Sequence, residues 1–313
     1  MAIEIGCQCD TGNGNTGLPD CTSLFGVAKG LGVQNMVAKD GTENKIDLSV
    51  ASIGTTFVDL LTDSDVSKRL YPITEIRNIT FPKEDTQYET DSSGQKSELR
   101  EGIQSFLGEK WDCEPAFVSK LKQGKCKRNG VFLFSLKGVQ GIRKFDESDQ
   151  RYYFYPIEVR AYAPYYMPQT DASKPKAMIP FDFAPTVETG ELWTVSWDDL
   201  GTSYEAMVGL MDVNFKTVDT ITGGGTSSVG LRLYSDYGSG LDNTTTQNVD
   251  GLTTSDFTVT NKGTGLAVAG LAVTEVPDNK YTINWTSESA ASVIEISVNT
   301  STGFEGKTTV IEP

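Results

Sequence analysis

The sequence predicts a mainly β protein built from two domains. Runs of aromatic and β-branched residues, separated by Gly, Pro and Asp clusters, fill the middle of the chain and are typical of sheet. Short runs of the same kind recur at regular spacing over about the last ninety residues, as in a small β-sandwich. The clearest helical pattern lies in one segment, residues 113–126. With 313 residues, the chain has room for one large domain or two of ordinary size.

The N-terminal part begins without a recognisable element. Residues 1–45 alternate short apolar patches with Gly, Asn and Asp clusters, and the glycines and proline of the opening stretch argue against regular structure there. Residues 45–50 (KIDLSV) predict a strand. Residues 55–71 carry a short helical pattern, for which Thr62 or Asp63 would be the cap.

The next segment predicts a projecting arm followed by the best helix of the chain. Residues 73–81 are rich in β-branched side chains with imperfect alternation and predict a strand. Residues 82–100 are polar, contain the turn sequence DSSG, and predict a long hairpin or flexible arm. Residues 101–111 continue as a strand. The segment 113–126 has apolar residues at helical spacing, begins with Glu-Pro and stops at a glycine, as helices do.

Sheet-forming runs fill the rest of the first domain, which we expect to span residues 1–222. Residues 203–215 fit a short helix and a strand equally well. Near residue 217 the composition becomes rich in Thr, Ser and Gly, which is typical of a linker. The predicted strands before this point lie at residues 131–142, 151–167, 176–185 and 191–197.

The second domain is expected to span residues 223–313 as a small β-sandwich. Trp285 would be its core aromatic residue. No cysteine follows Cys126, so this domain has no internal disulfide and must depend on packing. Its strands are predicted at residues 229–235, 256–261, 271–276, 280–286, 292–299 and 307–313.

Charge and composition exclude several functions. Lys and Arg number 27 against 42 Asp and Glu, which gives a net charge of −15 and a pI near 4.5, so the surface repels a phosphate backbone. The chain has no histidine, which removes Ser-His-Asp and Cys-His nucleophiles, histidine-based zinc sites and the usual general base near neutral pH. The triple glycine at 223–225 lacks the Gly-Lys of a phosphate-binding loop. We therefore expect no enzyme activity and no catalytic residue.

Neighbouring carboxylates are expected by chance in a chain this acidic, and each pair is interpreted as part of a solvated surface. Examples are Asp146 with Glu147, Glu188 with Glu191, and Asp198 with Asp199.

The stretch CQCDTGNGNTGLPDC, residues 7–21, is the strongest candidate for a metal site or a disulfide cluster. As a calcium loop it has glycines where oxygen ligands belong, and it ends in Cys21 where an acid is required. As a zinc site it offers Cys7, Cys9 and Cys21 with an unsuitable C-x-C spacing, and its fourth ligand would have to be Cys113, Cys126, Asp10 or Asp20. Five cysteines also leave one unpaired. We expect reduced thiols and no metal or cofactor, and the sequence leaves the redox state of these three cysteines open.

A basic cluster lies in and after the predicted helix. It has two interpretations: the exposed face of that helix, or a surface that meets an acidic face of a neighbouring copy. In an acidic chain without a nucleic-acid motif, both are favoured over phosphate binding. The cluster consists of Lys120, Lys122, Lys125, Lys127 and Arg128.

The C-terminal segment resembles the immunoglobulin-like modules of bacteria and phages. The resemblance covers about 85 residues. It depends on the strand entry formed by Leu252, Thr253, Asp256 and Phe257, and on the Tyr-Thr-Ile strand at 281–283. It implies a core that includes Phe257, Tyr281, Ile283 and Trp285, and it identifies a fold more than a function.

The N-terminal part resembles the tail tube proteins of long-tailed phages. The polar arm is followed by the strand REGIQSFLGEKW, the helix EPAFVSKLKQGKC and the strands NGVFLFSLKGVQGI and RYYFYPIEVRAY, which is the order of elements in tube subunits. The resemblance covers residues 70–215. It implies a β-sandwich or half-barrel with one helix that joins its copies into closed rings, and rings that stack into a hollow tube.

The same resemblance implies the partners of the chain. Copies of itself and other virion proteins would be bound through strand edges, the basic cluster and the arm, while DNA would pass an acidic lumen without specific binding. The immunoglobulin-like domain would face outward and bind bacterial-surface carbohydrate weakly, if at all. The arm residues expected at inter-subunit contacts are Glu84, Asp85, Tyr88, Glu89 and Asp91.

Three alternatives remain open: another virion component such as a head decoration or connector subunit, a surface adhesion or carbohydrate-binding protein, and a glycosidase that uses paired carboxylates. The N-terminus MAIEIGCQCD has no secretory signal and the chain has no apolar run of membrane-spanning length, which disfavours an exported adhesin. We expect synthesis in a host cytoplasm and a final location in the virion, in the phage tail, without contact with a membrane.

Overall fold

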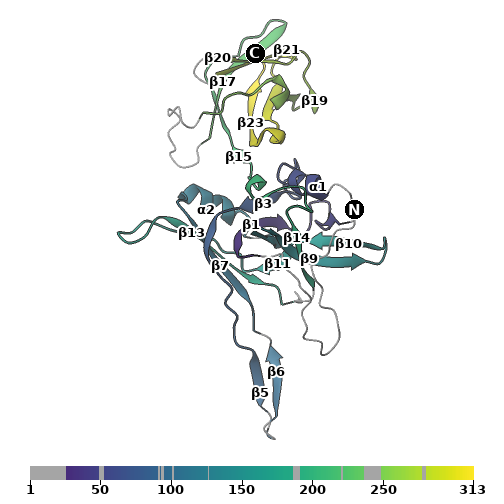
Figure 1. Ribbon diagram of the computed structural model, residues 1–313. Coiled ribbons are helices and arrows are strands. Elements are labelled where there is room, and N and C mark those ends of the chain that lie inside the picture. Colours follow the sequence, from purple (N-terminus) through teal and green to yellow (C-terminus); the bar gives the residue numbers. More distant parts are fainter. Residues whose placement is uncertain are drawn as a thin grey trace. The chain divides into compact units, whose positions relative to one another are not determined.

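The computed structural model describes residues 26–48, 53–90, 92, 95–100, 102–125, 127–185, 191–219, 221–235, 248–276 and 280–313. The prediction of a mainly β protein is confirmed: 51% of the structure is strand and 9% is helical. The chain divides into two compact units, of which the first ends at Gly209 and the second is Leu210–Pro313 (Figure 1). The stretch 7–21, with Cys7, Cys9 and Cys21, lies outside the described residues.

Twelve strands of the first unit form one hydrogen-bonded sheet. The main path runs β2-β10-β9-β8-β11-β13-β7-β4, while β1 joins β8 to β3, β14 pairs with β9, and β12 pairs with β13. These strands are β1 (Ala28–Asn35), β2 (Ile46–Asp47), β3 (Leu70–Ile73), β4 (Ile76–Thr80), β7 (Ser105–Trp111), β8 (Asn129–Ser135), β9 (Gly138–Asp146), β10 (Arg151–Tyr155), β11 (Ile157–Arg160), β12 (Tyr165–Met167), β13 (Lys176–Phe183) and β14 (Leu192–Ser196).

Strand β11 connects two layers of this sheet. It pairs with β8 through Ile157 and Glu158, and with β13 through Val159 and Arg160. One apolar core lies between the layers, formed by residues such as Leu133 of β8 and Phe181 of β13. A second core covers the other face of β8, β9 and β10. The first unit is therefore a bent β-sandwich with a further apolar layer on one side.

Two α helices lie in the described chain, where the fold prediction had one. Helix α2 (Pro115–Lys122) falls within the predicted segment 113–126, begins at a proline and packs Val118 against Ala177 of β13. Helix α1 (Ile53–Asp59) places Phe57 edge-on to Phe132, with ring centroids 5.7 Å apart. The helix thus begins before the predicted segment 55–71 and ends early in it, at Asp59.

The prediction that Thr62 or Asp63 caps the helix of 55–71 is wrong, because α1 ends before both residues. The side chain of Asp63 instead accepts a hydrogen bond from the amide of Asp65. Asp65 in turn accepts bonds from the amide and hydroxyl of Ser67, at the start of a single turn. These aspartates satisfy backbone donors in a loop rather than at a helix N-terminus.

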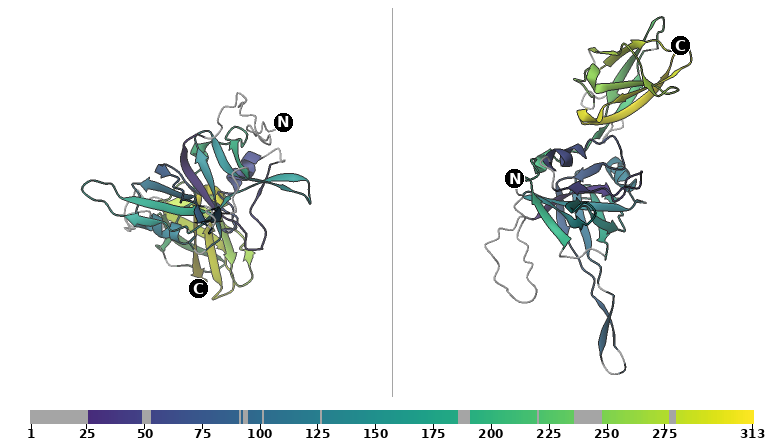
Figure 2. Two further views of the ribbon diagram at one scale, coloured as in Figure 1. Left: turned by 90° about the horizontal axis from the view of Figure 1, so that it is seen from below. Right: turned by 90° about the vertical axis from the view of Figure 1, so that its right-hand side faces the viewer.

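The predicted arm is a hairpin of β5 (Gln87–Thr90) and β6 (Lys96–Arg100), which form a two-stranded sheet of their own. Figures 1 and 2 show it extending away from the other strands of the first unit. The strand predicted at 73–81 is observed in part: β4 covers Ile76–Thr80, Ile73 ends β3, and Thr74 and Glu75 lie between the two strands. Asn78 takes a left-handed conformation beside a register shift in β4, which explains the imperfect alternation of that segment.

The second unit is a sandwich of two antiparallel layers, in which β15 alone among the described strands pairs in parallel. The core between the layers includes Tyr281, Ile283 and Trp285, each 0% exposed, and Phe257. One sheet has the order β15 (Met211–Asp212), β23 (Phe304–Ile311), β22 (Val293–Val298), β18 (Phe257–Asn261) and β19 (Leu266–Ala267), and the other the order β16 (Asn214–Thr217), β17 (Thr226–Tyr234), β21 (Lys280–Thr286) and β20 (Ala272–Val276).

The six strands predicted between residues 229 and 313 are confirmed. Three short 3-10 helices lie in the described chain, at Tyr204–Ala206, Thr254–Asp256 and Thr300–Thr302. The ambiguous segment 203–215 contains the first of these helices together with β15 and the start of β16. Because β15 and β16 pair with β23 and β17, the second unit begins earlier than the predicted boundary at 222/223.

Candidate functional site

The root of the arm is held firmly by the sheet. The amide of Glu84 donates to the carbonyl of Ile103, and the amide of Ser105 donates to the carbonyl of Pro82. Phe81 packs edge-on to Phe106, with ring centroids 5.5 Å apart. The root therefore fixes where the hairpin leaves the sandwich, a feature that the polar sequence 82–100 did not reveal.

Beyond the root, the arm exposes its side chains. Every residue of β5 is exposed, and Tyr88 shows 57% of its surface to solvent. Glu84, Asp85 and Glu89 are exposed as well. Asp91 lies outside the described residues. An isolated two-stranded hairpin is marginally stable in water at best, so the arm lacks the packing that would stabilise its shaft.

The basic cluster lies in the last turn of α2 and in the turn that follows it. Lys120, Lys122, Lys125 and Lys127 are all exposed. Arg128 differs, because its guanidinium forms two hydrogen bonds with Glu158, at 2.9 and 3.0 Å. This pairing raises the pKa of Arg128. The four lysines are thus exposed along α2 and the turn after it, while Arg128 is paired within the chain.

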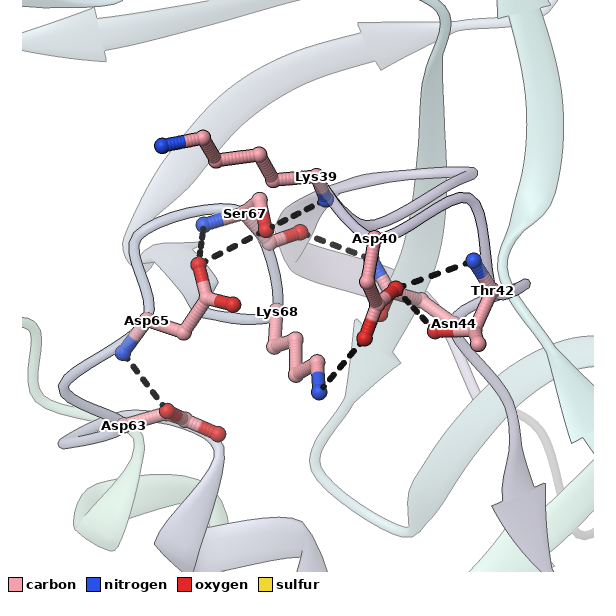
Figure 3. Close-up of polar contacts among 8 residues, drawn as sticks. All are labelled: Lys39, Asp40, Thr42, Asn44, Asp63, Asp65, Ser67 and Lys68. Atoms are coloured by element: carbon pink, nitrogen blue, oxygen red, sulfur yellow. Dashed lines mark hydrogen bonds and ion pairs between the residues drawn. The ribbon is translucent and has the colours of Figure 1, made fainter.

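A polar network connects two loops of the first unit (Figure 3). The Asn44 amide group donates to the Ser67 carbonyl, the Ser67 hydroxyl accepts the Lys39 amide, and Lys68 forms an ion pair with Asp40. Hydrogen bonds from the hydroxyl and amide of Thr42 lower the pKa of Asp40 to about 2. Because these oxygens are used by neighbours in the chain, we interpret the network as a structural clamp between loops.

Carboxylates that could act in a glycosidase are also used internally. A hydrogen bond from the Ser148 hydroxyl, followed by one from Lys45, lowers the pKa of Asp146 to about 2, so this carboxylate is ionised near neutral pH. Asp199 accepts a hydrogen bond from the Ser196 hydroxyl at 2.6 Å. Glu188 lies outside the described residues. In the described part of the chain, no group of three or more Cys, Asp or Glu residues is arranged to hold a metal ion.

The residues that lead into β18 of the second unit form reciprocal side-chain-to-backbone hydrogen bonds. Thr253 and Asp256 form a capping box before β18, and the carboxylate of Asp256 accepts the Thr253 amide at 2.7 Å. The hydroxyl of Tyr281 donates to the carbonyl of Val249 and accepts the amide of Leu252. The residues on which the immunoglobulin-like resemblance depends therefore perform local structural tasks.

The chain matches no protein-family model, and no curated protein or solved structure is detectably similar to it. Among the described residues, no helix has the length and apolar character needed to cross a bilayer. Function must therefore be inferred from the surfaces themselves.

Proposed function

We propose that this chain is a self-assembling structural protein of a virion, whose first unit forms stacked rings that build a phage tail tube. The observation that carries the proposal is the arm. Its root is fixed by backbone pairing and by Phe81, while its shaft is a bare two-stranded hairpin with Tyr88 exposed. A two-stranded hairpin is marginally stable alone and gains stability when it packs against another molecule.

The distribution of charge favours a second copy of this chain as the molecule against which the arm packs. The described root and shaft expose three acids and two lysines, whereas α2 and the following turn expose four lysines; the arm residues are Lys83, Glu84, Asp85, Glu89 and Lys96. Complementary patches on one chain can pair between copies, and a repeated head-to-tail contact forms a ring when its rotation closes. The net charge of −15 is compatible with a lumen that DNA passes without adhering.

The arm is tested by replacing residues 86–99 with an Asn-Gly turn, which keeps the paired root. We expect the wild type to form rings or tubes of uniform bore in negative-stain images. The shortened variant should remain a monomer with an unchanged unfolding midpoint, because the arm contributes no buried core. Normal tubes from the variant would exclude an assembly role for the arm, and a wild type that stays monomeric and binds glycans would overturn the proposal.

Exchanging charges between the arm and the lysines of α2 and the following turn tests whether these two surfaces pair in the assembly. Lys122→Glu with Lys125→Glu should weaken assembly, as should Asp85→Lys with Glu89→Lys. Combining all four changes should restore part of the assembly, because opposite charges again face each other. Assembly is followed by light scattering at low and high salt, and a quadruple variant weaker than both doubles would contradict this pairing.

A further inference from the structure

A row of stacked side chains lies on one face of the sheet formed by β14, β9 and β10. The guanidinium of Arg143 lies 3.7 Å from the ring centroid of Trp193 and 3.6 Å from that of Tyr152. Tyr152 also packs on Phe145, with ring centroids 4.9 Å apart. We call these four residues the arginine ladder.

The arginine ladder lies on the same face of the sheet as the apolar core near α1, outside the part that this core covers. Phe154 and Val139, which belong to the core near α1, share this face with Phe145 and Tyr152 by the alternation of β9 and β10. Phe145 and Tyr152 nevertheless remain 45% and 43% exposed. Aromatic side chains left open beside an arginine are the composition of protein interface centres.

Within the described part of the chain, Arg143 has no partner of the kind that a charged group in this position requires. Its Nε and Nη1 atoms are buried without a hydrogen-bond acceptor, and no ion pair of Arg143 is found in the described part of the chain. Two charged residues of the hairpin formed by β9 and β10 are paired: Arg151 with Asp47, and Asp146 with Lys45, which precedes β2. The stacked rings remove water from the guanidinium without supplying a counter-charge, which is unfavourable unless an anion reaches the group.

We propose that the arginine ladder is an interface for a second copy of this chain, which supplies a carboxylate to Arg143 and covers Phe145 and Tyr152. Charge complementarity identifies the occupant. The chain has 42 acidic against 27 basic residues, so its own surface is rich in the group that Arg143 lacks. Stacking holds the planar guanidinium in one orientation, which suits pairing with a carboxylate. The inference rests on self-assembly as part of the proposed function.

The test is sedimentation velocity of the full chain over a range of concentrations. Arg143→Gln removes the charge, and Arg143→Lys keeps the charge but loses the planar stacked group. Both should weaken self-association by about 10- to 100-fold, as expected for loss of one charge-assisted contact. Arg151→Gln is the matched control, because Arg151 lies on the same hairpin and is paired within the chain, and it should associate like the wild type. Thermal unfolding should confirm that each variant folds.

If the Arg143 variants fail to fold, Phe145→Ser provides the same test at an exposed position and should also weaken association. Association of the folded variants equal to that of the wild type would overturn the proposal, as would a wild type that is monomeric at all concentrations. Rings that form normally with Arg143→Gln would refute the ladder while leaving the tube proposal intact. If the wild type associates without forming rings and Arg143→Gln abolishes that association, the ladder interface is supported and the tube proposal is refuted.

Discussion

At the residue scale, the second unit depends on one buried carboxylate near its end. Glu312 is 4% exposed and accepts hydrogen bonds from Trp285 Nε1 at 2.6 Å, the Ser227 hydroxyl at 2.5 Å and the Glu288 amide at 3.1 Å. Burial alone would raise the pKa of Glu312. The hydrogen bonds from Ser227, Glu288 and Trp285 outweigh burial and hold the pKa below its ordinary value of 4.5.

Glu312→Gln should lower the free energy of unfolding at pH 7 by roughly 1–3 kcal/mol, because the amide cannot accept all three donors and leaves a buried group unsatisfied. The sign of the pH dependence follows from the lowered pKa. The stabilisation by ionised Glu312 is complete above the pKa of the unfolded chain and is lost as the pH falls through the folded pKa. Urea unfolding at pH 7 and at pH 3 should therefore show a smaller difference between variant and wild type at pH 3.

Glu295→Gln is the control for this prediction. Glu295 pairs with Lys307 at the surface, so its loss should cost less than about 0.5 kcal/mol. A difference between Glu312→Gln and wild type that is the same at both pH values would contradict a role for the ionised form.

At the element scale, β1 shows why part of the fold was not predictable. The sequence of Ala28–Asn35 contains two glycines in eight residues and predicts no element, yet β1 is a buried strand between β8 and β3. Its glycines are required by neighbours: a Cβ on Gly32 would lie 2.6 Å from the Phe134 ring and 2.8 Å from Leu70. In the sequence, such glycines indicate an interruption of regular structure, whereas in the packed sheet they leave room for neighbouring side chains.

Gly32→Ala should accordingly destabilise the first unit by about 1–3 kcal/mol, the usual cost of overpacking a core. Gly26→Ala is the matched control, since a Cβ there meets no atom within 4 Å, and it should change stability by less than about 0.5 kcal/mol. Thermal unfolding followed by circular dichroism measures both. Equal stability of the two variants would mean that β1 adapts without strain.

Other elements were predictable because their information is local. Aromatic and β-branched runs predicted β8, β10 and β21, and the Glu-Pro start with a glycine stop predicted α2. The arm was predictable as a hairpin from its polar composition and turn sequence. The arginine ladder was not, because Arg143, Tyr152 and Trp193 come from three strands and meet only through pairing of the sheet.

At the scale of the whole molecule, the boundary between the units decides what can fold alone. The second unit has its own core, which includes Val213 before the Thr/Ser/Gly-rich stretch as well as Trp285 after it. β16 pairs with β17 over Asn214–Thr217, and β15 pairs with β23. The composition change near residue 217 therefore marks a connection inside the sandwich, between two of its strands, and not the connection between units.

This boundary predicts different behaviour for two fragments. Residues 210–313 should unfold in one cooperative transition, because they contain every described strand of both layers. Residues 223–313 lack β15 and β16. Without this segment, the core that contains Trp285 loses Val213, and one edge of β17 has no neighbouring strand. We expect the shorter fragment to be at least about 3 kcal/mol less stable, from lost apolar burial and strand pairing. Urea titrations followed by tryptophan fluorescence compare the two directly, and equal stabilities would place β15 and β16 outside the folding unit.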